Sequence, residues 1–307
     1  AIGYQALSGT DANANNKNIA IGNYVMDANL TGATNNVAVV HLALSAITSG
    51  DANVSLGSEA GESINTGLYN VSIGYQSNEA ITSGQYNITI GAFALETATT
   101  ALKNIMIGGG AGQNITAGVA VNGAIGIGYG AFSGTGTQTT DINHTIAIGT
   151  NTLANLESGI GNTAVGFEAL KAEDDGDHNT AIGYQALVAQ TGTSGTVANT
   201  AVGYKALDGI LTGVSNVAVG ANALGNADGA ENENVGIGYN AGINLDNGSN
   251  NIAIGSNTNF STAAASNQVV IGKDATGVAN NSVTLGNADV TNIYMAQAQR
   301  LDGKIFL

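Results

Sequence analysis

The sequence predicts an all-β fold, a parallel β-solenoid in which each repeat forms one coil of an elongated rod. A short phrase ending in glycine recurs from one end of the chain to the other, and such self-similarity is the mark of a repeat architecture. No amphipathic helical pattern exceeds two turns. The chain has 45 Gly and no Pro, and a stacked strand excludes Pro because Pro cannot donate to the ladder.

The repeats are aligned on the glycine of the phrase, with Val40 filling one vacant slot, which gives 17 copies. Nine of the 16 spacings are 17 residues, the others run from 18 to 21, and the last is 14. The aligned glycines are Gly3, Gly22, Gly57, Gly74, Gly91, Gly108, Gly128, Gly149, Gly166, Gly183, Gly203, Gly220, Gly238, Gly255, Gly272 and Gly286.

Four columns precede the glycine. The residue directly before it is Ile, Val or Leu, the next is usually small, the third is Val, Ile or Thr, and the fourth is Asn in 12 copies. Four residues rich in β-branched side chains and bounded by turn formers indicate a short strand. After the glycine, "YQAL" predicts a second short extended piece, and the remaining polar residues predict turns.

Each column has a physical reason in a stack. The aliphatic column should form a buried apolar ridge that includes Ile21, Ile73, Ile148, Ile182 and Ile254. Glycine suits a corner that needs positive φ or a close approach. Stacked amides can form a ladder, here through Asn18, Asn70, Asn162, Asn179, Asn216 and Asn251. The extra residues of the long coils after Gly108, Gly128 and Gly183 should leave the rod as outward loops.

The repeat count sets the size and organisation of the rod. At about 4.8 Å per coil, 17 coils predict a rod roughly 80 Å long. We expect residues 1–286 to form the repeat shaft, and residues 287–307 to form a C-terminal transition or cap leading to a region outside this sequence.

Composition excludes several function classes. Seven Lys and Arg against 22 Asp and Glu give a net charge of −15, so a nucleic-acid partner is not expected. The sequence contains no run of about 18 apolar residues, so it predicts no membrane-spanning helix. The absence of Cys excludes disulfides and zinc–thiolate sites. We expect no cofactor.

The strand phrase is apolar on both faces, as in "NTAIG". One face fills the coil, and the other needs a cover that no helix of this chain supplies. Further copies of the same chain are the expected cover, because most oligomers are homomeric and symmetric. This argument does not fix the order of symmetry.

The phrases "NKNIAIGN", "DHNTAIGY" and "NNIAIGS" resemble the head repeats of trimeric autotransporter adhesins. The longer "NTAIGYQAL" copies resemble repeats of phage tail fibres and similar surface fibres. The ending "NQVVIGKDATGVANNSVTLGNADVTNIYMAQ" is similar to the segment that precedes a self-cleaving chaperone in many such fibres. The resemblance covers nearly the whole chain and implies a left-handed parallel β-roll and a homotrimer.

Several stretches suggest local sites, each with a simpler alternative. Glu173, Asp174, Asp175 and Asp177 could hold Ca²⁺, but the loop lacks EF-hand order, so a solvated loop is favoured. "IGGGAG" (107–112) lacks nucleotide-loop spacing and reads as an ordinary repeat. The column after the glycine could form an aromatic strip for sugar stacking or could pack at the coil corner, which is favoured; it holds Tyr4, Tyr75, Tyr129, Phe167, Tyr184, Tyr204 and Tyr239. The three His show no metal-ligand spacing; they are His41, His144 and His178.

Three functions remain open at this stage. The favoured one is a structural and attachment role, as the shaft of a trimeric tail fibre or similar extracellular appendage with a cell-surface glycan or protein receptor. The alternative is the head of a bacterial trimeric autotransporter adhesin that binds its ligand directly. A carbohydrate-active enzyme is the third, but no residue group singles out a catalytic coil, so we expect no enzyme activity.

Overall fold

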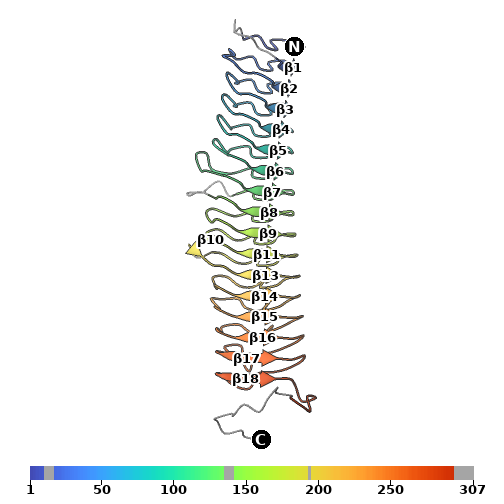
Figure 1. Cartoon of the computed structure of the whole chain (residues 1–307), viewed down its shortest axis with the longest axis vertical. Helices are drawn as coiled ribbons and strands as arrows, with labels where there is room; N and C mark the ends of the chain where they lie inside the picture. Colours follow the sequence, from blue (N-terminus) through green and yellow to red (C-terminus); the bar gives the residue numbers. More distant parts are fainter. Residues whose placement is uncertain (10–16, 135–141, 193–194, 294–307) are drawn as a thin grey trace.

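The computed structural model describes residues 1–9, 17–134, 142–192 and 195–293, which form a single rod (Figure 1). The rod is a parallel β-solenoid, and its described residues contain no helix. Consequently, no helix in these ranges could cross a membrane. Each coil, called a rung below, contributes one short strand to a sheet that runs the length of the rod.

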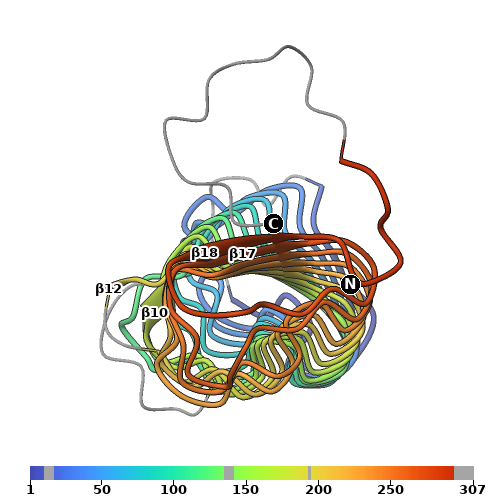
Figure 2. The ribbon, with the colours of Figure 1, turned by 90° about the horizontal axis from the view of Figure 1, so that it is seen from below.

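Sixteen strands pair in parallel in chain order to make this sheet. A second sheet of two short strands, β10 and β12, lies apart from it (Figure 2). The strands are β1 (Ile19–Ile21), β2 (Val37–Val39), β3 (Val54–Leu56), β4 (Val71–Ile73), β5 (Ile88–Ile90), β6 (Ile105–Ile107), β7 (Ile125–Ile127), β8 (Ile146–Ile148), β9 (Thr163–Val165), β10 (Gly176–Asp177), β11 (Thr180–Ile182), β12 (Gly195–Thr196), β13 (Thr200–Val202), β14 (Val217–Val219), β15 (Val235–Ile237), β16 (Ile252–Ile254), β17 (Gln268–Ile271) and β18 (Ser282–Leu285).

The strands pair in the register that the repeat alignment requires. Ala181 of β11 lies between Ala164 of β9 and Ala201 of β13, so identical column positions face each other. Side chains therefore stack mainly on their own kind along the rod. Residues that occupy the same position in successive repeats therefore lie in a row along the rod.

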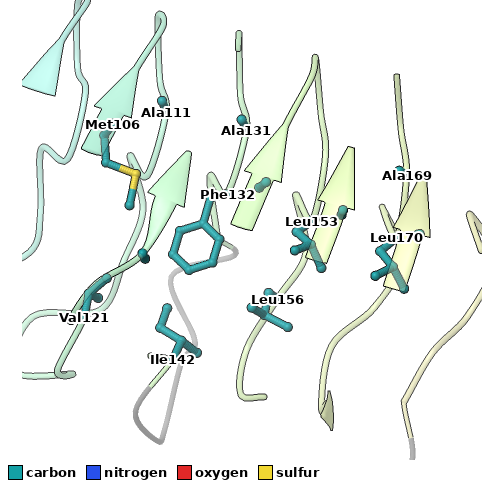
Figure 3. Packing of buried hydrophobic residues seen from close by; sticks show 14 of the residues in the cluster. Met106, Ala111, Val121, Ala131, Phe132, Ile142, Leu153, Leu156, Ala169 and Leu170 are labelled. Atoms are coloured by element: carbon teal, nitrogen blue, oxygen red, sulfur yellow. The ribbon is translucent and has the colours of Figure 1, made fainter. Parts of the chain in front are cut away.

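The interior of the rod is filled by the small strand centre and by residues that follow the glycine. Ala147, Ala164 and Ala181 are fully buried at strand centres. Leu153 and Leu170, four residues after their rung glycines, supply the bulk opposite them (Figure 3). A further interior column lies seven residues after the glycine and holds Ile47, Ile64, Ile81, Ile115, Leu156, Ile210 and Leu245.

The predicted burial of the aliphatic column is wrong in this chain. Ile21, Ile148 and Ile182 are 36–41% exposed, and Ile73 and Ile254 are partly exposed. In a three-residue strand the centre points to one side and both ends point to the other. The leucines on the opposite side of the coil leave room only for a small residue at the strand centre. The large residues at the two strand ends therefore face outward.

The fit of this interior is tight where a large centre does occur. Met106 occupies the centre of β6, and its neighbour in β7 is Gly126. A Cβ at Gly126 would lie 2.7 Å from Met106 Sδ and 3.4 Å from Phe132 Cβ. The extra volume of Met106 is therefore offset by the missing side chain in the next rung, as close packing requires.

The rung glycine satisfies both constraints expected of it. Gly238 has φ +132°, and a Cβ there would lie 2.6 Å from the carbonyl oxygen of Gly255 in the next rung. A side chain on Gly238 would therefore clash with the next rung. Glycine fills this column in every aligned rung but one, because the backbones of successive rungs come this close; the exception is Val40, which has φ +93°.

The predicted second extended piece is wrong: "YQAL" forms a turn. In the copy after Gly183, Gln185 has φ +52° and Leu187 has φ +53°. Left-handed residues other than Gly are disfavoured, and they persist here because the rungs on both sides hold them. Gln185 N donates to Phe167 O (2.9 Å), and Leu187 N donates to Ala206 O (3.1 Å).

The long coils differ in how much of them is described. After Gly108, the prediction of an outward loop is confirmed, because Ala117 and Gly118 are exposed. After Gly183, the added residues bring β12 onto β10 at the side of the rod (Figure 2). The extra residues after Gly128 fall at 135–141, outside the described residues.

Replacing Ala181 by Asp should prevent folding of the chain, because a carboxylate would enter a fully buried column without a partner. The same is expected at Ala164 and Ala201. Ala264→Asp is the matched control, since Ala264 is exposed. Circular dichroism and thermal unfolding should show loss of the β signal for Ala181→Asp and no loss for the control. A folded Ala181→Asp rod would contradict the placement of this column.

Candidate functional site

The outward face of the main sheet carries exposed apolar side chains along the length of the rod. It is formed by the two strand ends of each rung, such as Thr180 and Ile182 in β11, and these side chains are partly or well exposed. Ile19 is 51% exposed, and the face continues to Leu285 in β18. Sixteen strands at about 4.8 Å give a stripe roughly 70 Å long. The larger exposed members are Ile19, Ile21, Leu56, Ile88, Ile90, Ile148, Ile182, Val219, Ile237, Ile271, Val283 and Leu285.

A buried column of Asn side chains runs along the edge of this sheet. In the repeating arrangement, Asn70 Nδ2 donates to Asn53 Oδ1 (3.0 Å) and to Gly84 O (2.8 Å). Asn70 Oδ1 in turn accepts from the backbone N of Asn87 (3.1 Å) and from its Nδ2 (3.0 Å). Each amide is thereby satisfied, as a buried polar group must be.

The predicted Asn residues lie in two stretches of this column. The stretches are separated where Ala124 and Thr145 take the Asn position. The first holds Asn18, Asn36, Asn53, Asn70, Asn87 and Asn104, and the second holds Asn162, Asn179, Asn199, Asn216, Asn234 and Asn251.

Replacing Asn70 by Ala should lower the free energy of unfolding by about 2–3 kcal/mol, because it leaves buried partners on both sides unpaired. Asn70→Asp should cost more at neutral pH, since it adds a charge and removes both donors. Protonation should recover part of that loss in acid. Denaturant unfolding at pH 7 and pH 4 measures both effects. Equal stability of Asn70→Ala and the parent chain would count against the ladder as a stabilising element.

The acidic loop proposed for Ca²⁺ does not converge on one point. Its carboxylates bind donors of the protein instead: Ser158 Oγ donates to Asp175 Oδ1 (2.6 Å), Ile160 N to Asp177 Oδ1 (2.8 Å), and Gly192 N to Asp174 Oδ1 (2.8 Å). Each contact joins neighbouring rungs. The geometry indicates an inter-rung clasp for this loop.

Glu173, the first acidic residue of that loop, is fully buried inside the rod. It lies seven residues after Gly166, in the column that holds Ile, Leu or Ala in most other rungs. Gln190 lies in the same column one rung later, and its Nε2 donates to Glu173 Oε2 (2.5 Å). Gly176 N also donates to Oε1 (2.7 Å), and Asn179 Nδ2 to Oε2 (3.2 Å).

Burial raises the pKa of the Glu173 carboxyl above its ordinary value of 4.5, against the hydrogen bonds from Gly176 and Gln190, which lower it. At pH values between the pKa of Glu173 in the unfolded chain and its higher pKa in the folded chain, the folded chain binds more protons than the unfolded chain. The contribution of Glu173 to stability therefore grows as pH falls through that window. The buried carboxylate depends on its donors at neutral pH.

Two other acidic groups were missed in the sequence. The carboxylates of Glu59, Glu62 and Glu79 lie within 4.8 Å of one another, as do those of Asp228, Glu231 and Asp246. The 17-residue spacing of Glu62 and Glu79 places both in one column, and this signal was available. Burial first, and neighbouring carboxylates second, raise the pKa of Glu79. Oxygen ligands of this kind suit Ca²⁺ or Mg²⁺.

Aromatic rings occupy the outer corner that follows the rung glycine. Phe167, Tyr184 and Tyr204 are exposed and stack at centroid distances of 5.2 and 5.5 Å, with rings 14° from parallel. Stacking covers the ring faces that a sugar would use, so this trio packs along the rod. His41 contacts the ring of Tyr24 edge-on, and no His belongs to an acidic group within the described ranges.

Comparisons of the chain with protein-family models, with curated proteins and with solved structures give no match.

Replacing Gln190 by Leu should destabilise the rod by about 2–3 kcal/mol at pH 7, because the buried Glu173 carboxylate loses a donor. The loss should shrink as pH falls, since removal of that donor raises the Glu173 pKa further. Gln185→Leu is the matched control, because Gln185 makes the same contact with Glu168 (2.8 Å) at the partly exposed corner. Denaturant titrations at several pH values should separate the two variants. Equal losses would contradict the role assigned to burial.

Proposed function

We propose that this chain is the shaft of a homotrimeric extracellular fibre, a tail fibre or a similar attachment appendage. The observation that carries the proposal is the apolar stripe on the outward face of the sheet. Soluble monomers rarely expose a continuous apolar patch of such length. A second copy of the same chain presents the same stripe, so copies around a common axis cover one another.

The order of three comes from the resemblance of the "NTAIGYQAL" repeats to those of trimeric surface fibres. A threefold arrangement fits a rod with an apolar stripe along the sheet, because each stripe then faces the axis. The net charge of −15 would lie on the sides away from the axis, where it keeps the assembly soluble.

The role of such a shaft is to give the fibre its length, and this role follows from the rung geometry. Each rung adds a fixed rise, and its buried contacts are made mainly with the rungs before and after it, as in other solenoids. Length therefore scales with repeat number at little change in local structure. The proposal assigns no reaction, cofactor or nucleic-acid partner to the chain, and it names a cell-surface glycan or protein as the receptor.

Light scattering of the purified chain should give three times the single-chain mass of 30.4 kDa. Ile182→Asp should abolish this assembly, because three carboxylates would meet near the axis in a region without counter-ions. Ala264→Asp, on an exposed loop position, is the control and should retain the mass. A folded parent chain with the mass of a single copy would end the proposal.

A further inference from the structure

The outer corner of the rod carries a second ladder, formed by the residue two positions after each rung glycine. Gln76 Nε2 donates to Glu59 Oε2 (2.7 Å) in one part of it. In another part, Asn222 Nδ2 donates to Asn240 Oδ1 (3.1 Å), and Asn240 Nδ2 donates to Asn257 Oδ1 (3.2 Å). Side chains in this column therefore bond along the rod.

The column is not a continuous ladder, since it also holds apolar side chains such as Leu42 and Phe93, and at two consecutive rungs it holds no side chain at all, at Gly110 and Gly130. The neighbouring column, which holds aromatic residues in many rungs, has Gly109 at the same place. The result is a hollow of about 450 Å³, called the glycine notch below, lined by these glycines and bounded by Phe93, Tyr129 and Asn151. This volume lies within the range of about 300–1,000 Å³ for ligand pockets.

The backbone does not require glycine at these positions of the ladder. Gly110 has φ +65° and Gly130 has φ +59°. Phe93 and Asn151 adopt φ +60° and +52° at the same column position with side chains present. A Cβ at Gly110 would meet only the flexible end of Gln113, with Oε1 at 2.9 Å. Glycine at these positions leaves empty the space that a side chain of this column would occupy.

The aromatic ring beside the notch is available, unlike the stacked trio farther along the rod. Tyr129 is 70% exposed, and no ring among the described residues stacks on it. One edge of the ring lies over Gly109, where a Cβ would be 3.5 Å from Tyr129 Cδ2. The ring is therefore supported by backbone and open to a ligand.

Polar groups with free hydrogen-bonding capacity surround this ring. Gln113 Nε2 donates to Glu96 Oε2 (2.8 Å), which turns Oε1 toward Gly110. The side-chain amides of Asn114 and Asn151 line the notch and make no hydrogen bond with other residues of the described chain. No lining residue is charged, and Glu96 stands behind Gln113, so an anionic ligand is disfavoured.

An exposed aromatic face, adjacent amides and a neutral lining match the two surfaces of a sugar ring, one of C–H groups and one of hydroxyls. We propose that the glycine notch binds a neutral saccharide, with Tyr129 stacking on its C–H face and Asn114, Asn151 and Gln113 bonding its hydroxyls. The notch lies at the corner that follows the strand ends, beside the apolar stripe, and none of its lining residues belongs to a strand. This inference rests on the proposed attachment role and gives the shaft a contact of its own.

The test uses the intact chain with a panel of neutral methyl glycosides and oligosaccharides, and with sialic acid as the anionic comparison. Saturation-transfer NMR should show neutral sugars in contact with an aromatic side chain and no sialic acid binding. Tyr129→Ala should weaken binding roughly tenfold or more. Tyr239→Ala is the matched control, because Tyr239 occupies the same column, is exposed, and lies outside the notch.

Filling the notch is the second arm. Gly110→Asn introduces a residue that this column already holds in other rungs, so the rod should fold and sugar binding should be lost. Binding that survives both Tyr129→Ala and Gly110→Asn, or a parent chain that binds no neutral sugar at millimolar concentration, would overturn the inference. Light scattering of the same samples separates the two proposals: a trimer without sugar binding refutes only the notch, and a single chain that binds sugar refutes only the trimer.

Discussion

The contact on which the rest of the structure depends is the one between the rung glycines. At the corner after nearly every strand of the main sheet the backbones of successive rungs approach so closely that a Cβ would clash, as at Gly238 against Gly255; Val40 is the exception in this column. This contact fixes the register, because a slip of one residue would place a side chain there. With the register fixed, the remaining residues of a repeat also face the same column position in the next rung. The residue types found in a column are then those whose side chains can stack on one another.

Columns differ in how well they tolerate self-stacking. Amides do so fully, since Asn carries both donor and acceptor, and the Asn column is buried for that reason. Aliphatic side chains and aromatic rings also stack. Carboxylates do not: burial and then the neighbouring Glu62 raise the pKa of Glu79, and elsewhere a carboxylate accepts from an amide of the next rung, as Glu168 does from Gln185. The polar chemistry of the rod follows from this rule.

The sequence predicted the period, the strand positions and the parallel pairing because these depend on column spacing alone. It did not predict which strand face is interior, since "TAI" offers large residues on one side and a small one on the other, and hydrophobicity favours burying the large side. The deciding quantity was volume: the columns of Leu170 and Ile210 had already filled the coil. The turn at "YQAL" was missed because Gln185 and Leu187 carry no turn signal, and hydrogen bonds to the neighbouring rungs hold their conformation. Glu173 was read as a loop residue, although its distance from Gly166 equals that of Ile210 from Gly203 and assigns it to the interior.

Positions at which a rung departs from the repeat therefore indicate most about rung order and about binding sites. In the interior, Glu173 and Gln190 replace apolar residues with a pair that can satisfy each other only when their two rungs are adjacent. Such a pair opposes stacking in a shifted order, which a chain of near-identical rungs would otherwise permit at small cost. At the corner, Gly109, Gly110 and Gly130 interrupt two columns and leave Tyr129 and Asn151 without a side chain of their own column in the preceding rung. The saccharide site proposed above therefore follows from the same rule as the Glu173–Gln190 pair: an interruption inside the solenoid opposes a shifted order of rungs, and an interruption on its outside leaves space beside a side chain that lacks a column neighbour.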